Sequence, residues 1–176
     1  KSTSASNTIY DIKVTDYTTD IEGWQIHKIG EYFQDNGNIF DGMTAADSLK
    51  GHEGFYYKRL MPIKDTTSFP KDTSIYINYT GRLLDGTVFD TTDERLAKDS
   101  GIWSSARTYE PVKINWGENY TDLTMGSNSS SVITGFALTL WQMRKFEKGI
   151  GVFTSDYGYG YSGSGENIPG FAPLSF

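Results

Sequence analysis

The residues best suited to chemistry lie in one short stretch, residues 78–90, which reads NYTGRLLDGTVFD. The Asp85-Gly86 pair favours a tight turn between two short strands. Such a hairpin would bring together a phenol, an aromatic ring and a carboxylate, those of Tyr79, Phe89 and Asp90. Because the stretch holds no thiol and no imidazole, this set suits the binding and rotation of a bond better than hydrolysis.

Composition excludes several other kinds of site. The chain has no cysteine, so disulfides, thiolate catalysis and cysteine-bound zinc are excluded. Its two histidines, His27 and His52, are far apart and lack metal-ligand spacing. The net charge of −6 comes from scattered acids, and no run approaches the ~18 apolar residues of a membrane span. We therefore expect no metal, no cofactor, no nucleic-acid partner and no membrane-spanning helix.

The elements that must position the 78–90 stretch are mostly strands. Aromatic residues make up 15% of the chain and there are 19 glycines, a composition typical of short strands joined by turns. Alternating apolar residues predict strands near residues 55–61, 75–79, 112–116 and, more weakly, 149–155. Residues 134–145 have the apolar spacing of a helix, and we predict no other helix after residue 50.

The first residues have the character of a tether. Residues 1–7 are small and polar, and Tyr10, Ile12 and Val14 alternate like a short strand or extended arm. Because residue 1 is not methionine, we expect that a signal peptide was removed upstream of Lys1. That would leave a periplasmic or outer-membrane-anchored lipoprotein, attached to the membrane only through a lipid; a trimmed cytosolic protein is the alternative.

A helical extension follows the tether. Apolar residues predict a helix from Ile21 to Phe33, with a capping box at residues 19–22 and a stop at Asn36-Gly37. We therefore predict two domains, an N-terminal tether and helical extension over residues 1–52 and a second domain over residues 53–176.

The 78–90 stretch resembles the signature of the FKBP-type peptidyl-prolyl cis-trans isomerases, and further landmarks follow in the order of that family. They are PVKI at 111–114, VITGF at 132–136, Leu140-x-x-Met143, DYGYG at 156–160, and Ile168-Pro169 with Ala172-x-Leu174. Upstream, residues 53–58 resemble the strand that joins Mip-like members of the family, an exported bacterial lipoprotein type, to an N-terminal extension. The resemblance covers residues 55–176, and its specificity comes from the order of the pieces.

This resemblance implies an α+β fold, in which an antiparallel β-sheet wraps around one short α-helix and a pocket lies between them. The residues that it implies as catalytic are Asp90, Tyr159, Tyr79 and Ile133. The residues that it implies for substrate contact are Phe89, Val112, Val132, Phe136, Ile168 and Arg95. The Tyr159 hydroxyl and the Ile133 amide would hold substrate carbonyls, and Arg95 would steady Asp90.

The sequence also departs from the family pattern. Phe136 stands where a tryptophan usually forms the pocket floor, and Val112 replaces an aromatic residue of the wall. Residues 91–110 and 118–131 are longer than usual and would cover or block the pocket mouth. Ser155 replaces a customary proline.

The resemblance implies an isomerase that rotates Xaa-Pro bonds in client polypeptides and so assists folding. Its partners would be proline-containing chains, with macrolide inhibitors as further ligands. Two alternatives stay open. One is a catalytically weak chaperone or peptide-binding module on the same fold, which Val112 and the long segments favour. The other is a surface carbohydrate-binding β-domain, which the many tryptophans and tyrosines favour.

Overall fold

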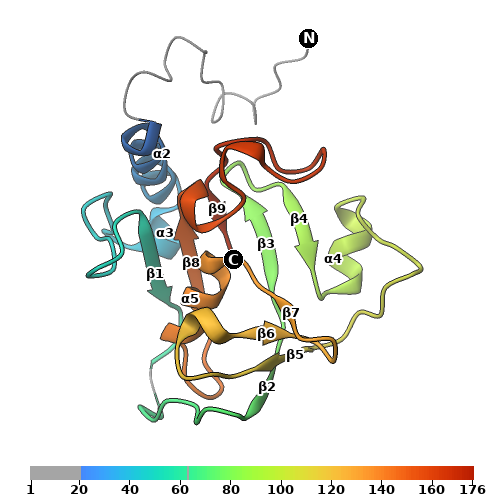
Figure 1. Cartoon of the computed structure of the whole chain (residues 1–176). Coiled ribbons are helices and arrows are strands. Elements are labelled where there is room, and N and C mark those ends of the chain that lie inside the picture. Colours follow the sequence, from blue (N-terminus) through green and yellow to red (C-terminus); the bar gives the residue numbers. More distant parts are fainter. Residues whose placement is uncertain (1–20, 63) are drawn as a thin grey trace.

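The computed structural model describes residues 21–62 and 64–176. In this range the chain forms two β-sheets with helices packed on and between them (Figure 1). The tether at 1–7, the alternating residues Tyr10 to Val14 and the start of the capping box at 19–20 lie outside the described residues.

The larger sheet has five strands in the order β1-β8-β9-β3-β4. Their bounds are Phe55–Arg59 for β1, Gly149–Phe153 for β8, Leu174–Ser175 for β9, Thr80–Leu83 for β3 and Val88–Thr91 for β4. The smaller sheet has the order β2-β5-β6-β7. Its strands are Ser74–Ile77 (β2), Val112–Asn115 (β5), Thr124–Met125 (β6) and Ser130–Ser131 (β7). All of these strand pairs are antiparallel.

The helix α5, Thr134–Gln142, lies between the two sheets (Figure 1). Its Leu138 packs into a cluster with Phe55 and Phe153 of the larger sheet. Its Phe136 and Leu140 pack into a second cluster that contains Ile114 of the smaller sheet. Both sheets therefore fold around one short helix, which confirms the predicted α+β architecture.

A second helical layer covers the outer face of the larger sheet. The helix α2, Ile21–Asp35, packs Ile29 and Phe33 against Tyr56 of β1 and Val152 of β8. Because side chains alternate along a strand, the neighbours of Tyr56 and Val152 face α5 instead. The short helix α3, Gly37–Phe40, completes this layer. The helix predicted from Ile21 to Phe33 is thus confirmed.

The sequence prediction missed several elements, among them α4, the β6–β7 hairpin and β9. The helix α4, Glu94–Asp99, shows that the prediction of no other helix than 134–145 after residue 50 is wrong. The Asp93 side chain caps α4 by accepting a hydrogen bond from the Leu96 amide. The β6–β7 hairpin was also missed, because strands of two residues leave no alternating pattern in the sequence. The described residues also form the 3₁₀ turns η2 (Tyr120–Asp122), η3 (Ser155–Tyr157) and η4 (Gly160–Ser162).

Candidate functional site

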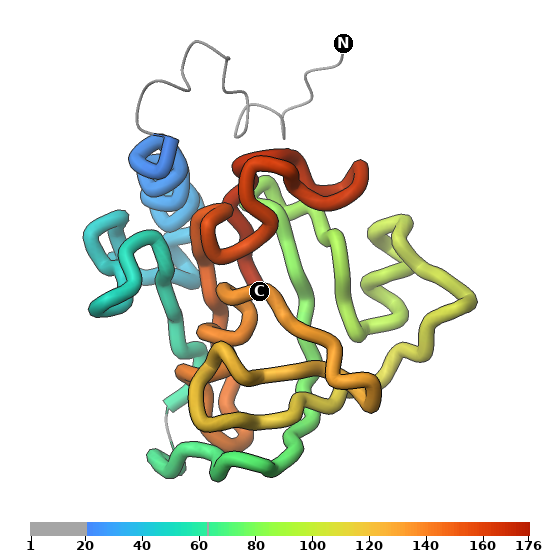
Figure 2. The backbone as a smooth tube through the Cα atoms, viewed as in Figure 1, coloured from blue at the N-terminus to red at the C-terminus, as the bar shows by residue number. Residues whose placement is uncertain are grey.

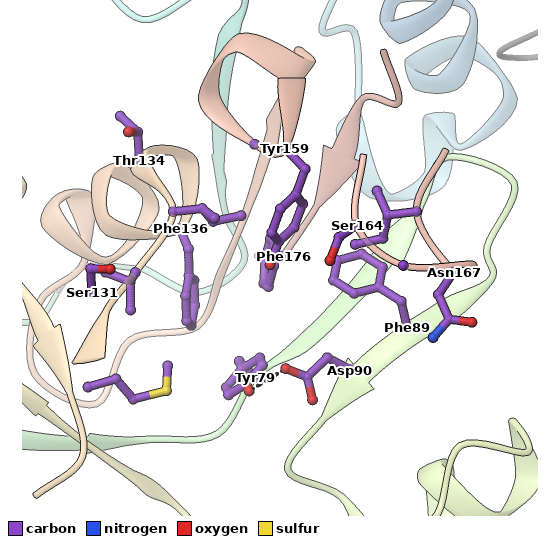
Figure 3. A pocket seen from close by; sticks show the side chains of 16 residues that line it. Tyr79, Phe89, Asp90, Ser131, Thr134, Phe136, Tyr159, Ser164, Asn167 and Phe176 are labelled. Carbon is purple, nitrogen blue, oxygen red and sulfur yellow. Dashed lines mark hydrogen bonds between the residues drawn. The ribbon is translucent and has the colours of Figure 1, made fainter. Parts of the chain in front are cut away.

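A cavity of about 730 Å³ opens at the N-terminal end of α5, between this helix, the β3–β4 hairpin and the loop that follows η3. Its wall contains eight residues that the sequence analysis placed in a pocket (Figure 3): Tyr79, Phe89, Asp90, Val132, Ile133, Phe136, Tyr159 and Ile168. These residues come from four separate parts of the chain. The fold therefore brings them together around one space.

The hairpin that carries Phe89 and Asp90 has the expected tight turn. Gly86 has a φ of +94°, a conformation that glycine adopts without strain, and Thr87 N–H donates to Asp85 Oδ1 at 2.9 Å. Opposite Asp90 lies Gly81, where an added Cβ would lie 2.6 Å from the Phe89 ring. A glycine at this position is what allows Phe89 to lie across the strand.

The floor of the pocket is aromatic. Phe136 is 5% exposed, and its ring stacks on Phe176 at a centroid distance of 4.7 Å. The Tyr79 ring lies 4.9 Å from Phe136, and the Phe89 ring meets Phe176 edge to face at 5.4 Å. Such contacts fix the rings by packing, so the apolar surface presented to a ligand is preformed.

A polar group borders this floor. Tyr79 Oη donates a hydrogen bond of 2.6 Å to Asp90 Oδ2. Arg107 Nη1 contacts Asp90 Oδ1, and its Nη2 lies 3.3 Å from Tyr79 Oη. Arg107 therefore binds both partners of the Tyr79–Asp90 pair. The charge of the carboxylate is balanced by a cation at the edge of the pocket.

The phenol of Tyr79 stays protonated at neutral pH. Burial, followed by the hydrogen bond to Asp90, raises the pKa of Tyr79 to about 12. Burial and the Asp90 charge also raise the pKa of Tyr159. Both phenols are therefore hydrogen-bond donors at physiological pH.

Two donors on residues of the pocket wall have no partner within the part of the chain that the structure describes. Tyr159 projects into the cavity beside Phe176 (Figure 3), and its hydroxyl has no hydrogen-bond partner among residues 21–62 and 64–176. Ile133 precedes the first residue of α5, and its carbonyl accepts from Ala137 N–H. In the same described range, Ile133 N–H binds no other group. A ligand with carbonyl groups would satisfy both donors.

Two of the residues expected at the site lie elsewhere. Arg95 is 90% exposed on α4 and faces Asp99 at 3.9 Å, so the prediction that it steadies Asp90 is wrong; Arg107 has that position instead. Val112 pairs with Ile77 in the smaller sheet and is not part of the pocket wall, so the prediction that it contacts substrate is also wrong.

Arg107, Phe176 and Met125 are among the residues of the site that the sequence analysis missed. Phe176 had a usable signal, because it follows Leu174 by two positions and strand residues two apart share a face. Met125 lies in the undetected β6 and lines the cavity wall. Arg107 had no local signal, since its contact depends on the path of the whole 91–110 segment.

The two long segments do not block the cavity. Residues 100–110 extend away from the sheets at the side of β4 (Figure 2), and Trp103 in this segment is 43% exposed. Only Met125 and Ser131 of the 118–131 segment reach the wall, together with Val132 just beyond it. Tyr120 packs against the core and His52 instead.

Two further features bear on cofactors and membranes. Within residues 21–62 and 64–176, no three His, Asp or Glu side chains gather so that they could hold a metal ion. None of the described helices is long and apolar enough to cross a bilayer.

A family profile described as FKBP-type peptidyl-prolyl cis-trans isomerase matches residues 66–176. The macrophage infectivity potentiator of Trypanosoma cruzi is 27% identical over 151 residues, which are 85% of this chain but 64% of that protein. FK506-binding protein 1A of Aspergillus fumigatus is 32% identical over 120 residues, 68% of this chain and 86% of that protein. A solved peptidyl-prolyl cis-trans isomerase from Pseudomonas syringae pv. tomato aligns at 24% identity and a TM-score of 0.47, over 89% of this chain and 90% of that one.

Proposed function

Because this chain belongs to the FKBP-type peptidyl-prolyl cis-trans isomerase family, we propose that its pocket catalyses rotation about Xaa-Pro peptide bonds in client polypeptides. The observation that supports this best is the pairing of an aromatic floor, built on Phe136 and Phe176, with the Tyr79–Asp90 hydrogen bond at its edge. Such a site can bind a proline ring and its flanking carbonyls without any bond being broken.

The reaction needs a site that prefers the twisted amide. An Xaa-Pro bond rotates over a barrier of about 18–20 kcal/mol and takes tens to hundreds of seconds without a catalyst. At half rotation the resonance between nitrogen and carbonyl is lost, so the amide is less charge-separated than in either planar isomer. An apolar cavity therefore favours the twisted state over the planar states, which is catalysis by differential binding. Lowering the barrier by about 4 kcal/mol would speed rotation about a thousandfold.

Each role follows from the position of the residue in the pocket. Phe89, Phe136 and Ile168 would hold the proline ring, with Val132 at the edge. The Ile133 amide and the Tyr159 hydroxyl would donate to substrate carbonyls. Asp90 would orient Tyr79 and present its charge to the carbonyl that turns.

The expected partners are proline-containing polypeptides, and the protein would assist their folding. A relative carries the name FK506-binding protein, which supports a macrolide as a second ligand of the same pocket. The reasons for a catalytically weak binding module on this fold are weaker than the sequence suggested, since neither Val112 nor any residue of 91–110 lines the cavity.

We also propose that the protein is exported and held at a membrane surface by a lipid. The support is the similarity to a macrophage infectivity potentiator and the small polar run over residues 1–7. Labelling cells that express the full gene with a radioactive fatty acid tests the anchor. Recovery of unlabelled protein only in the cytosol would contradict both parts of this proposal.

A protease-coupled assay on an Xaa-Pro tetrapeptide tests the activity. The wild-type chain should accelerate the slow phase of cleavage, which is limited by cis–trans isomerisation of the Xaa-Pro bond. Asp90→Ala should lower kcat/KM by about tenfold, because Tyr79 loses its hydrogen-bond acceptor and Arg107 loses its counter-charge. Asp90→Asn keeps the shape and one acceptor oxygen and should fall between the two. Equal rates for wild type, Asp90→Ala and buffer would remove the proposal. Peptide binding without acceleration would favour the binding module.

A further inference from the structure

The loop that carries Tyr159 is held by Gln25 of the N-terminal extension and by Glu53 and Gly54, which directly precede β1. Thr154 N–H donates to the Gly54 carbonyl at 3.0 Å, and Tyr157 Oη donates to the Glu53 carbonyl at 2.9 Å. From α2, Gln25 makes two further hydrogen bonds to Ser155. These contacts all lie at the start of the loop, on η3 or immediately before it.

The Gln25–Ser155 contact is a buried, two-point clamp. Ser155 N–H donates to Gln25 Oε1 at 2.7 Å, and Gln25 Nε2 donates to Ser155 Oγ at 2.9 Å. The two residues are 3% and 2% exposed, so water cannot easily replace either partner. A buried donor or acceptor that loses its partner is strongly unfavourable, so the clamp fixes the distance between α2 and η3.

The clamp is connected to the pocket through the turn itself. The Ser155 carbonyl accepts a hydrogen bond from Gly158 N–H at 2.9 Å, and the Thr154 carbonyl accepts one from Tyr157 N–H at 3.0 Å. Gly158 is packed tightly, because an added Cβ would lie 3.0 Å from the Leu174 side chain. The next residue is Tyr159, which projects into the cavity. The direction of the phenol is therefore set by the turn that begins at Ser155.

We propose that Gln25 is a positioning residue for the isomerase: by holding Ser155, it sets the turn that aims the Tyr159 hydroxyl at the substrate. Residues 21–54 are then part of the catalytic unit rather than a separate appendage, although the family profile matches only residues 66–176. This inference rests on the proposed function for its effect on turnover. Its structural part can be tested without turnover.

Ser155 offers a sharp test because of its place in the turn. It is the first residue of η3, and Thr154 before it is extended, with φ −70° and ψ 168°. Proline fits the first position of a helical turn after an extended residue, yet it has no N–H to donate. Ser155→Pro therefore preserves the turn but removes both contacts with Gln25. Gln25→Ala removes the same contacts from the other side.

The experiment compares Gln25→Ala, Ser155→Pro and the double variant in the full chain. Gln25→Ala leaves Ser155 N–H and Oγ in the turn without partners, so the Tyr157 and Gly158 amides should exchange their hydrogens at least about tenfold faster, and kcat/KM should fall about tenfold. In Ser155→Pro the orphaned groups are those of Gln25 on α2 and proline holds the turn, so both effects should be smaller. In the double variant no orphaned partner remains and proline stiffens the turn. Both readouts should therefore return to within about threefold of wild type, a non-additive pattern.

Ile29→Ala is the matched control. Ile29 lies on the same helix and is fully buried, but it packs against Phe33 and Tyr56 rather than against the loop. It should lower the unfolding midpoint while leaving exchange at Tyr157 and Gly158 and the kcat/KM of the folded protein unchanged. If Gln25→Ala behaves as Ile29→Ala does, Gln25 only stabilises the fold and the inference is overturned. If the Tyr157 and Gly158 amides exchange faster in Gln25→Ala but even the wild-type chain does not accelerate isomerisation, the structural role of Gln25 is supported and the proposed function is rejected.

Discussion

Removal of Arg107 is expected to slow isomerisation without unfolding the protein. Its guanidinium contacts Asp90 with one nitrogen and lies 3.3 Å from Tyr79 Oη with the other. Arg107→Ala removes both donors but leaves the 2.6 Å hydrogen bond between Tyr79 and Asp90 in place. The pair would then be free to tilt in the pocket, and the charge facing the substrate would be less well oriented.

The magnitude follows from the exposure of the pair. The Arg107 and Asp90 side chains are 33% and 34% exposed, so water screens part of their attraction. An exposed ion pair contributes about 0–1 kcal/mol, and a hydrogen bond to a charged group about 1.5–3 kcal/mol. Because the Arg107–Asp90 pair is partly exposed, we take about 1 kcal/mol, at the boundary of the two ranges, as the transition-state stabilisation that is lost. This corresponds to an approximately fivefold lower kcat/KM. The free energy of unfolding should fall by about 1 kcal/mol or less.

The protease-coupled assay, with urea unfolding of the same samples, measures both effects. Arg95→Ala is the control, because it makes the same change of charge on a side chain that is 90% exposed and should leave the rate unchanged. Arg107→Lys should recover only part of the rate, since an ammonium lacks the planar fork that contacts two oxygens. The reasoning is refuted if Arg107→Ala matches wild type, or if Arg95→Ala slows the reaction equally.

Three further outcomes are expected. Phe136→Leu should lower kcat/KM by about tenfold, with a loss of about 1–2 kcal/mol in the free energy of unfolding, because the flat floor against Phe176 is lost; the coupled assay and urea unfolding measure this. The pKa of Tyr79 is raised to about 12, so its contribution to stability is complete below about pH 10 and is lost as the pH rises through about 12. Thermal unfolding by circular dichroism from pH 7 to 12 follows the loss of stability, which should be smaller in Tyr79→Phe than in wild type; burial also raises the pKa of other tyrosines such as Tyr159, so part of the loss should remain. Gly81→Ala should displace the Phe89 ring and raise KM for the peptide more than it lowers kcat, which steady-state kinetics with wild type as reference would show.

Local patterns in the sequence predicted much of the fold. The Asp85-Gly86 turn and the alternation around it predicted the β3–β4 hairpin, because turn chemistry and strand period act over a few residues. The apolar spacing from Ile21 predicted α2 for the same reason. The pocket residues came from motifs in the correct order, and the fold gathers eight of them around one cavity.

What escaped prediction depends on contacts between distant parts of the chain. Arg95 has the expected spacing from Asp90, but the Asp93 cap starts a short helix that turns Arg95 to solvent. Arg107 reaches Asp90 only because of how the whole segment between them is folded. Gln25 lies 130 positions from Ser155, and no local rule connects a glutamine on a helix with a serine in a turn.

The central claim, that the pocket binds the twisted amide better than the planar one, is tested most directly by two-dimensional NMR exchange spectroscopy on an Xaa-Pro peptide with a small fraction of the wild-type chain. The account predicts cis–trans exchange cross-peaks that are absent from the peptide alone, with the ratio of the two isomers unchanged. Peptide resonances that broaden or shift on binding, with no cross-peaks at any mixing time, would contradict it.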